Sequence, residues 1–309
     1  MQEGAVISSN KEPANEYPTE LGQVHWGRDF KGALAEGERT GKPILVLFDE
    51  VPGCHTVQTY GRKVLSHPLI VEAAETLFVP VVVYNNVFTG PDTRIMAEFK
   101  EPTWNNPVVR IINPDKSARV PRISGDYSVG GLANAMVKSL QAPPMWLKIL
   151  AGETKAKRDG TKDALFSMYC FWSGEASLGQ IEGVVSTMPG FEGGKEVVQV
   201  TYDPTVINLD TLVSRAGNAG THISSPGKMR PSLKDNKYHL AHTSWRQVPM
   251  TSLQATLANA SVSRKQDPMG LFSPRQRQIH KALLANPDSS RPMHLGHGDL
   301  IEAWSRLQR

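Results

Sequence analysis

The two cysteines, Cys54 and Cys170, are the residues of this 309-residue chain best suited to covalent chemistry. A thiolate is both a nucleophile and a soft metal ligand. Two cysteines far apart in the chain do not make a disulfide framework, which needs more of them in a shorter sequence. They are therefore either two unrelated buried thiols or one functional pair shared by two domains, and the residues around each decide between these interpretations.

Cys54 follows a turn between an expected strand and an expected helix. The run Lys42–Glu50 has the length and branched composition of a buried strand, and the Pro-Gly pair just before Cys54 is a strong turn signal. The residues after Cys54, as far as His67, carry apolar side chains at helical spacing. The start of a helix favours a thiolate because its free backbone N–H groups and its dipole stabilise negative charge.

Cys170 has the same expected position, between a strand over Ala164–Cys170 and a helix that runs from Glu175 to about Ile181. The stretch around it reads SMYCFWSGEAS, so Phe171 and Trp172 come directly after the thiol. Taken alone, such an aromatic pair is typical of core packing. The expected order of strand, helix, strand, strand and helix indicates an α+β layer structure for this half of the chain.

From about Trp26 to Leu140 the chain resembles a thioredoxin-like domain. The matching pieces are GKPILVLF, the turn cysteine, KVLSHPLI, the strand FVPVVVYNN and the segment NNPVVRIINPD. The resemblance is to members of the family with a long first crossover, and it implies the thioredoxin-like fold for this part of the chain.

The thioredoxin resemblance also implies roles for individual residues. Cys54 matches the exposed attacking cysteine of the family, and Pro107 matches the cis-proline that lies against it. Val57 replaces the second cysteine of the usual C-x-x-C motif. Such a domain cannot close its own disulfide, so Cys54 is expected to form a mixed disulfide or to pair with Cys170.

The segment from about Asp163 to Gly220 is similar to peptide methionine sulfoxide reductase A. The family signature G-C-F-W-G-x-E appears as the residues from Tyr169 to Glu175. The stretches GVVSTMPGFEGG and VVQVTYDP, from Gly183 to Pro204, follow in the same order as in the family.

The reductase resemblance implies a reaction at a sulfoxide. Cys170 would attack the sulfur, its pKa lowered by the helix start. Glu175, expected to be buried and protonated, would donate a proton to the leaving oxygen as general acid. Phe171 and Trp172 would enclose the apolar methyl group on sulfur. The resulting sulfenic acid on Cys170 would then condense with Cys54 to form a disulfide.

The sequence departs from the family where the sulfoxide oxygen is bound. Phe191 stands where the family has a tyrosine, and a loop with a second tyrosine is missing after Gly194. Removing such a hydrogen-bond donor costs on the order of a hundred-fold in rate. Tyr169 is expected to restore a hydroxyl beside the nucleophile, and Tyr238 is matched to a late tyrosine of the family.

The overall expectation is an α/β protein with two domains. Residues 1–24 are expected to be a disordered tail, 25–143 a thioredoxin-like domain, 144–243 an α+β domain similar to methionine sulfoxide reductase A, and 244–309 a helical extension. The extension is expected to hold the two domains together, and a partner-binding surface is the alternative for it.

Composition excludes several classes of protein. The net charge of +4 comes from scattered basic residues, which argues against nucleic-acid binding. No stretch approaches the roughly 20 apolar residues of a membrane span. The N-terminal residues do not form a signal peptide, so a cytoplasmic protein is expected, or a periplasmic one if a leader was removed. His294 and His297 are expected to lie in a solvated loop rather than at a metal.

Three functions remain open from the sequence. The first is an oxidoreductase without a cofactor, acting on a protein or small-molecule sulfoxide and regenerated by an external thiol or a thioredoxin-type reductant. The second is a Cu(I)-binding protein using the two cysteines, with Met168 or His55 as further ligands. The third is a thioredoxin-like reductase fused to a degenerate second domain, for which only Cys54 is needed.

Overall fold

The computed structural model describes residues 17–103, 107–288 and 291–307. The first sheet has the strand order β2-β1-β3-β4, where β1 is parallel to β2 and antiparallel to β3. The strands are β1 (Ile44–Asp49), β2 (Val79–Tyr84), β3 (Val108–Ile112) and β4 (Ile123–Ser124). Strand β1 is buried along its whole length, because its alternate side chains enter two different cores on the two faces of the sheet.

Helices cover both faces of this sheet. They are α1 (Phe30–Thr40), α2 (His55–Tyr60), α3 (Pro68–Leu77), α4 (Pro91–Phe99) and α5 (Val129–Ser139). Helix α2 continues as a π-helical turn over Gly61–Leu65. The strand, turn and helix expected around Cys54 are therefore present, with Cys54 as the residue that caps α2.

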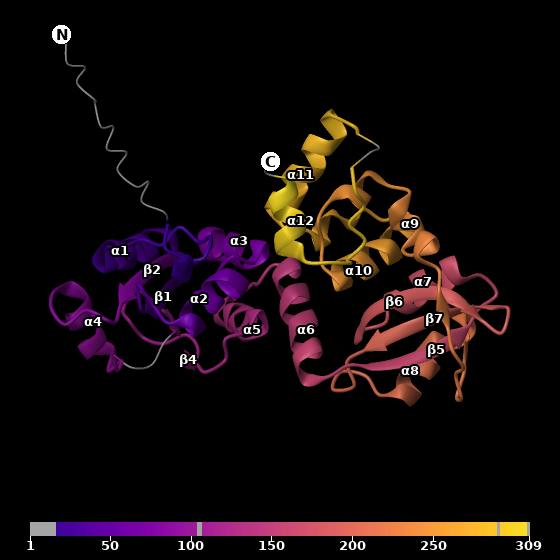
Figure 1. Ribbon diagram of the computed structural model, residues 1–309, viewed down its shortest axis with the longest axis horizontal. Coiled ribbons are helices and arrows are strands. Elements are labelled where there is room, and N and C mark those ends of the chain that lie inside the picture. The colour runs from indigo at the N-terminus through magenta and orange to yellow at the C-terminus, as the bar shows by residue number, and fades with distance from the viewer. Residues whose placement is uncertain (1–16, 104–106, 289–290, 308–309) are drawn as a thin grey trace, which may run out of the picture.

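Helix α6 (Met145–Asp159) stands between the two halves of the molecule (Figure 1). Its side chains Trp146, Leu147 and Leu150 belong to the core of the first sheet. The helix that follows the proline-rich stretch thus packs on the N-terminal domain, whereas the sequence placed it within the second domain. Apolar contacts along one face of α6, and not the prolines before it, decide where the first core ends.

The second sheet is antiparallel, with the strand order β8-β5-β7-β6-β9. Its strands are β5 (Lys162–Ser167), β6 (Val184–Glu192), β7 (Lys195–Tyr202), β8 (Thr221–His222) and β9 (Arg230–Pro231). Helices α7 (Phe171–Gly179) and α8 (Leu209–Ala216) pack against it. Helix α7 begins directly after Cys170, four residues earlier than the sequence pattern indicated.

The C-terminal helices form a third layer above α6 and α7 (Figure 1). They are α9 (Tyr238–Ala241), α10 (Ser252–Ser263), α11 (Pro274–Ala285) and α12 (Leu300–Leu307). Ser273 caps α11 through its side chain, as expected. The backbone N–H of Arg275 donates to Glu72 on α3, and that of Leu253 donates to Glu153 on α6. This layer therefore contacts the N-terminal domain and the helix that joins the domains.

The segment expected to be a tail is shorter than the sequence indicated. Residues Thr19–Leu21 form a 3₁₀ helix, and both Leu21 and Val24 are buried in the first core. The prediction of a tail is wrong for residues 19–24, because the side chains of Leu21 and Val24 pack in the first core. Residues 1–16 lie outside the described part of the chain.

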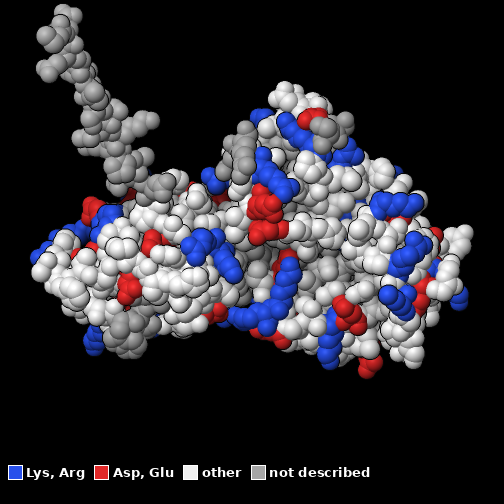
Figure 2. All heavy atoms as spheres, in the orientation of Figure 1, with Lys and Arg blue, Asp and Glu red and all other residues white. Residues whose placement is uncertain are grey.

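The face of the molecule shown in Figure 2 carries no large field of one charge. Figure 2 shows Lys and Arg interspersed with Asp and Glu over the face in view. Among the described residues, no helix combines the length and the apolar character needed to cross a membrane.

Candidate active site

Cys170 caps the N-terminus of α7 with extended backbone angles, and its thiol is half-buried. The hydroxyl of Ser173, in the first turn of the helix, lies 3.8 Å from the Cys170 sulfur and can donate to it. A hydroxyl donor and the free N–H groups of a helix start both stabilise a thiolate. The local structure therefore favours a reactive sulfur at this position.

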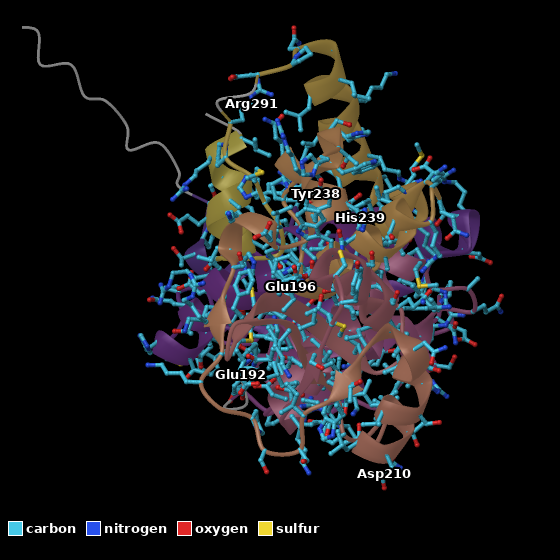
Figure 3. All side chains as sticks on the ribbon, turned by 90° about the vertical axis from the view of Figure 1, so that its right-hand side faces the viewer. Glu192, Glu196, Asp210, Tyr238, His239 and Arg291 are labelled. Atoms are coloured by element: carbon cyan, nitrogen blue, oxygen red, sulfur yellow. The ribbon has the colours of Figure 1, made fainter. Side chains whose placement is uncertain are left out.

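A carboxylate adjoins the same turn. Glu196 on β7 accepts a hydrogen bond from the backbone N–H of Phe171, the residue after the cysteine, with a donor–acceptor distance of 2.7 Å. The position of Glu196 follows from the hairpin between β6 and β7, in which Phe191 pairs with Glu196. In Figure 3, Glu196 lies between Tyr238 above and Glu192 below. An acid is therefore held next to Cys170.

The aromatic residues after Cys170 have different surroundings. Trp172 is half-buried, and the ring of Tyr238 stacks on it with a centroid distance of 3.9 Å and an interplanar angle of 14°. The Trp172 indole N–H donates to Asp235 over 3.2 Å. Phe171 is only 4% exposed and belongs to the core of the second sheet. Of the two rings expected to enclose a methyl group, Trp172 is the one that is partly open to solvent.

Neither Phe191, at the position of the family's tyrosine, nor Tyr169, expected to restore a hydroxyl, brings a hydroxyl into this site. The ring of Phe191 meets Phe171 edge-on, with 5.4 Å between centroids, and the guanidinium of Arg230 lies 5.3 Å from the Phe191 ring centre. Tyr169 is 102% exposed, so its side chain extends into solvent. Tyr238 does lie at the site, through its stacking on Trp172.

Glu175 is fully buried and ion-paired. Its Oε1 lies 3.0 Å from the ammonium of Lys237, and its Oε2 accepts the Lys237 backbone N–H over 2.8 Å. The hydroxyl of Thr187 also donates to Oε1. This arrangement differs from the proton donor expected from the sequence, because both carboxyl oxygens of Glu175 already have hydrogen-bond partners on Lys237 and Thr187.

Cys54 has an open environment. Its thiol is exposed, and Val57, at the position of the missing second cysteine, is fully buried in the same helix. Asp49, at the end of β1, is fully buried, and burial raises its pKa to about 9. No hydrogen bond of normal geometry reaches its carboxyl oxygens from the described residues, although the Glu50 backbone N–H opposes the rise. Pro107 is buried just before β3, but the peptide bond before it lies outside the described residues.

The two cysteines are not brought together. Both thiols are free. In Figure 1, α2 lies to the left of α6 and α7 lies to its right, so the helices that the two cysteines cap are on opposite sides of α6. A disulfide needs Cα atoms about 4.4–6.8 Å apart. The arrangement therefore does not support the expected Cys54–Cys170 disulfide, nor one metal ion shared by both thiols.

The two histidines of the C-terminal loop contact different partners. The His294 backbone N–H donates to the Arg246 carbonyl, and the His297 ring meets the side-chain amide of Asn236. Burial lowers the pKa of both imidazoles. No cluster of three or more potential ligands from His, Cys, Asp and Glu occurs among the residues that the structure covers.

Sequence reasoning missed three residues of the site, namely Glu196, Asp235 and Lys237. A signal for Glu196 was available. Two adjacent glycines between apolar runs predict a two-residue hairpin turn, and such a turn pairs Phe191 with Glu196. Gly193 and Gly194 both have positive φ, as that turn requires. Nothing local marked Asp235 or Lys237, which contact residues of α7 that lie 63 and 62 positions earlier in the chain.

Known proteins match the two halves separately. Residues 25–114 match a family model described as thioredoxin-like. Peptide methionine sulfoxide reductase MsrA of Enterobacter sp. (strain 638) is 30% identical over 128 residues, covering 36% of this chain and 57% of that protein. The protein of the same name from Vibrio vulnificus (strain CMCP6) is 34% identical over 79 residues, covering 20% of this chain and 38% of that protein.

A solved structure described as a DsbH oxidoreductase aligns with 42% of this chain and 95% of its own, at 16% identity and a TM-score of 0.32. The chain spans 57% or less of the length of the two curated relatives described above. The family model and the two curated relatives agree with the two resemblances carried by the sequence motifs. The chain thus joins an N-terminal thioredoxin-like domain to a C-terminal domain similar to peptide methionine sulfoxide reductase A.

Proposed function

We propose that the protein is a thiol-dependent oxidoreductase that reduces a sulfoxide, of which methionine sulfoxide is the first candidate, at Cys170. The observation that carries this proposal is the turn that begins α7. It places the Cys170 sulfur 3.8 Å from a hydroxyl donor, and it binds the carboxylate of Glu196 through the next backbone N–H. The similarity to proteins named peptide methionine sulfoxide reductase supports the choice of substrate.

The proposed step transfers oxygen from the substrate to the enzyme. The Cys170 thiolate attacks the sulfoxide sulfur, and the oxygen ends on Cys170 as a sulfenic acid while the substrate leaves as a thioether. The thiol is oxidised by two electrons and the sulfoxide is reduced by two. The oxygen needs a proton as it leaves, and we assign the donor to Glu196. Its Oε2 accepts the Phe171 N–H, so Oε1 would carry the proton.

Trp172 would bind the apolar group on the substrate sulfur. Its ring is half-buried and is held on one face by Tyr238 and at its N–H by Asp235. Because Phe191 supplies no hydroxyl, the oxygen would depend on Glu196 and on Tyr238 for hydrogen bonds. This assignment replaces Glu175, whose carboxylate is already engaged by Lys237.

We assign the second half of the cycle to an external thiol. The sulfenic acid on Cys170 condenses with a thiol to form a mixed disulfide and water, and a second thiol releases Cys170. Cys54 of the same chain lies on the other side of α6. Its exposed sulfur would undergo thiol–disulfide exchange with an external partner, independently of Cys170. The Cu(I) alternative needs both thiolates at one ion, which this arrangement does not support.

The test is a single-turnover reaction without reductant. Reduced protein is mixed with a methionine sulfoxide peptide, and the thioether formed is measured beside dimedone labelling of sulfenic acid. We expect close to one equivalent of each for the native chain and for Cys54→Ser, and none for Cys170→Ser. A reaction that survives Cys170→Ser but not Cys54→Ser would instead favour a thioredoxin-like reductase with a degenerate second domain.

A further inference from the structure

Lys237 is a buried cation with an unusual number of partners. Its side chain is 3% exposed, and its ammonium contacts Oε1 of Glu175 at 3.0 Å, the carbonyl and the hydroxyl of Thr187 at 2.6 and 3.1 Å, and the Asn236 side-chain oxygen at 3.2 Å. Its backbone N–H donates to the other oxygen of Glu175. One carboxylate of α7 therefore holds both the main chain and the side chain of Lys237.

The backbone of Lys237 is in the left-handed region, with φ of 51°. Residues other than glycine adopt this conformation at a cost, so the surrounding contacts must maintain it. A buried ion pair is weak evidence for stability, because desolvation offsets the attraction between the charges. It does impose a particular geometry, since either charge is costly to bury without the other.

The residues on either side of Lys237 contact the aromatic ring of the site. Asp235 accepts the indole N–H of Trp172, and the ring of Tyr238 stacks on the same indole. Trp172 is the second residue after Cys170. The segment from Asp235 to Tyr238 thus meets α7 three times, with Lys237 on the buried side and its neighbours at the site.

We propose that Lys237 is a positioning residue that holds Asp235 and Tyr238 against Trp172 and thereby shapes the binding site for the apolar group of the sulfoxide. The inference rests on the proposed function for its substrate. Lys237 itself touches neither the Cys170 sulfur nor the substrate, and it acts through the four-residue segment that it anchors to Glu175.

The same network connects the site to the C-terminal extension. Because the Asn236 side-chain oxygen accepts from the ammonium of Lys237, its NH₂ group faces the His297 ring. The Nε2 atom of His297 must then accept, so the imidazole is neutral with its proton on Nδ1. The extension therefore contributes a fixed hydrogen-bond acceptor to the support of the site, in addition to its packing on α7.

The test compares Lys237→Met with Lys234→Met, a control at an exposed lysine of the same segment. We expect Lys237→Met to lower kcat/KM for a sulfoxide by about tenfold or more, since misplacing a binding group by about 1 Å can cost on the order of a hundred-fold. Alkylation of Cys170 by iodoacetamide should change by less than about twofold, because Ser173 and Glu196 do not contact Lys237. Lys234→Met should leave both rates unchanged.

A double-mutant cycle with Tyr238→Leu separates positioning from a general effect on folding. If Lys237 acts through Tyr238, adding Lys237→Met to Tyr238→Leu should cause little further loss of kcat/KM. Losses that multiply would overturn the proposal. Near-ultraviolet circular dichroism reports the Trp172–Tyr238 stack without turnover, and Lys237→Met should lose the signal that Tyr238→Leu loses. A native protein without turnover would sink the proposed function but leave this comparison intact.

Should Lys237→Met fail to fold, the pair Glu175→Gln and Lys237→Met provides a neutral alternative. The new amide can accept the backbone N–H at position 237 and donate to the Thr187 hydroxyl, which lies 3.1 Å from Oε1 of Glu175 in the native chain, and no buried charge is left unpaired. We expect this double variant to fold and to keep a reduced kcat/KM, since the ammonium contacts to Thr187 and Asn236 are lost. Native kcat/KM in the double variant would show that the ammonium positions nothing.

Discussion

Cys54 and Cys170 both cap the N-terminus of a helix, yet their surroundings differ in every other respect. The third helical residue is Val57 in one case and Ser173 in the other, and only the serine can donate to the sulfur. The thiol of Cys54 is exposed, whereas that of Cys170 is half-buried. The turn at Cys170 also carries the stacked rings of Trp172 and Tyr238 and binds the carboxylate of Glu196. A position at the start of a helix favours a reactive thiolate in both cases. The surrounding residues determine whether the thiol is open to another protein or lies in a site that fits a small substrate group.

The strongest test of this difference is Glu196→Gln. An amide keeps the hydrogen bond from the Phe171 N–H but cannot donate an acidic proton, so we expect kcat to fall by about a hundred-fold or more. Steady-state turnover of a methionine sulfoxide peptide measures this. The alkylation rate of Cys54 should not change.

Glu182→Gln, at an exposed glutamate of the same domain, is the matched control and should keep the native kcat. If Glu196→Gln retained native turnover, the proton would have to come from another group, and the contrast between the two cysteines would rest on Ser173, the stacked rings of Trp172 and Tyr238, and the exposure of the thiols.

A second test concerns the buried acid of the N-terminal domain. Burial raises the pKa of Asp49 from 3.8 to about 9. The folded protein therefore keeps a proton that the unfolded chain releases, so the contribution of Asp49 to stability is largest below about pH 4 and is lost as the pH rises toward 9. The slope from one such group is at most about 1.4 kcal/mol per pH unit. The substitution Asp49→Asn removes this titrating group and therefore its contribution to the pH slope.

We expect Asp49→Asn to unfold at a higher temperature than the native chain at pH 8, with the gap narrowing toward pH 4. Thermal denaturation at several pH values measures this, and Asp210→Asn, at an exposed residue of α8, is the control. Cys170 alkylation should be unaffected. An unchanged pH slope would mean that Asp49 is solvated or paired in solution.

The smallest expected effect is that of Ser173→Ala. Loss of one neutral donor to the sulfur, worth about 1 kcal/mol, should slow the alkylation of Cys170 near neutral pH by about fivefold. Cys54 has no such donor at Val57, so its rate should stay constant. Ser214→Ala, on an exposed turn of α8, provides the control, and equal rates in all three proteins would show that the hydroxyl does not stabilise the thiolate.

Much of the fold was predictable because its signals are local. The apolar run before Cys54 became β1, the valine-rich segments became β2, β3, β6 and β7, and the Ser-Pro start of α11 became a capped helix. The start of α7 was placed too late, because FWSG has weak helical propensity. Tertiary contacts from Glu196 and Asp235 to this turn hold it in the helix.

The candidate site was only partly predictable. Cys170, Trp172 and Tyr238 do lie together. Tyr169 lies in a bend between β5 and α7, where its side chain is exposed to solvent. Glu175 was correctly expected to be buried, but its carboxylate is engaged by Lys237, which no local pattern marks.

Local sequence signals place each cysteine between a strand and a helix, because strand runs, turn residues and helix caps act over a few positions. Tertiary structure decided the neighbours of each thiol. Helix α6 packs on the first core and separates α2 from α7, and Lys237 reaches Glu175 across 62 positions. Such contacts depend on how buried surfaces and charges are matched throughout the chain, so no stretch as short as SMYCFWSGEAS can specify them.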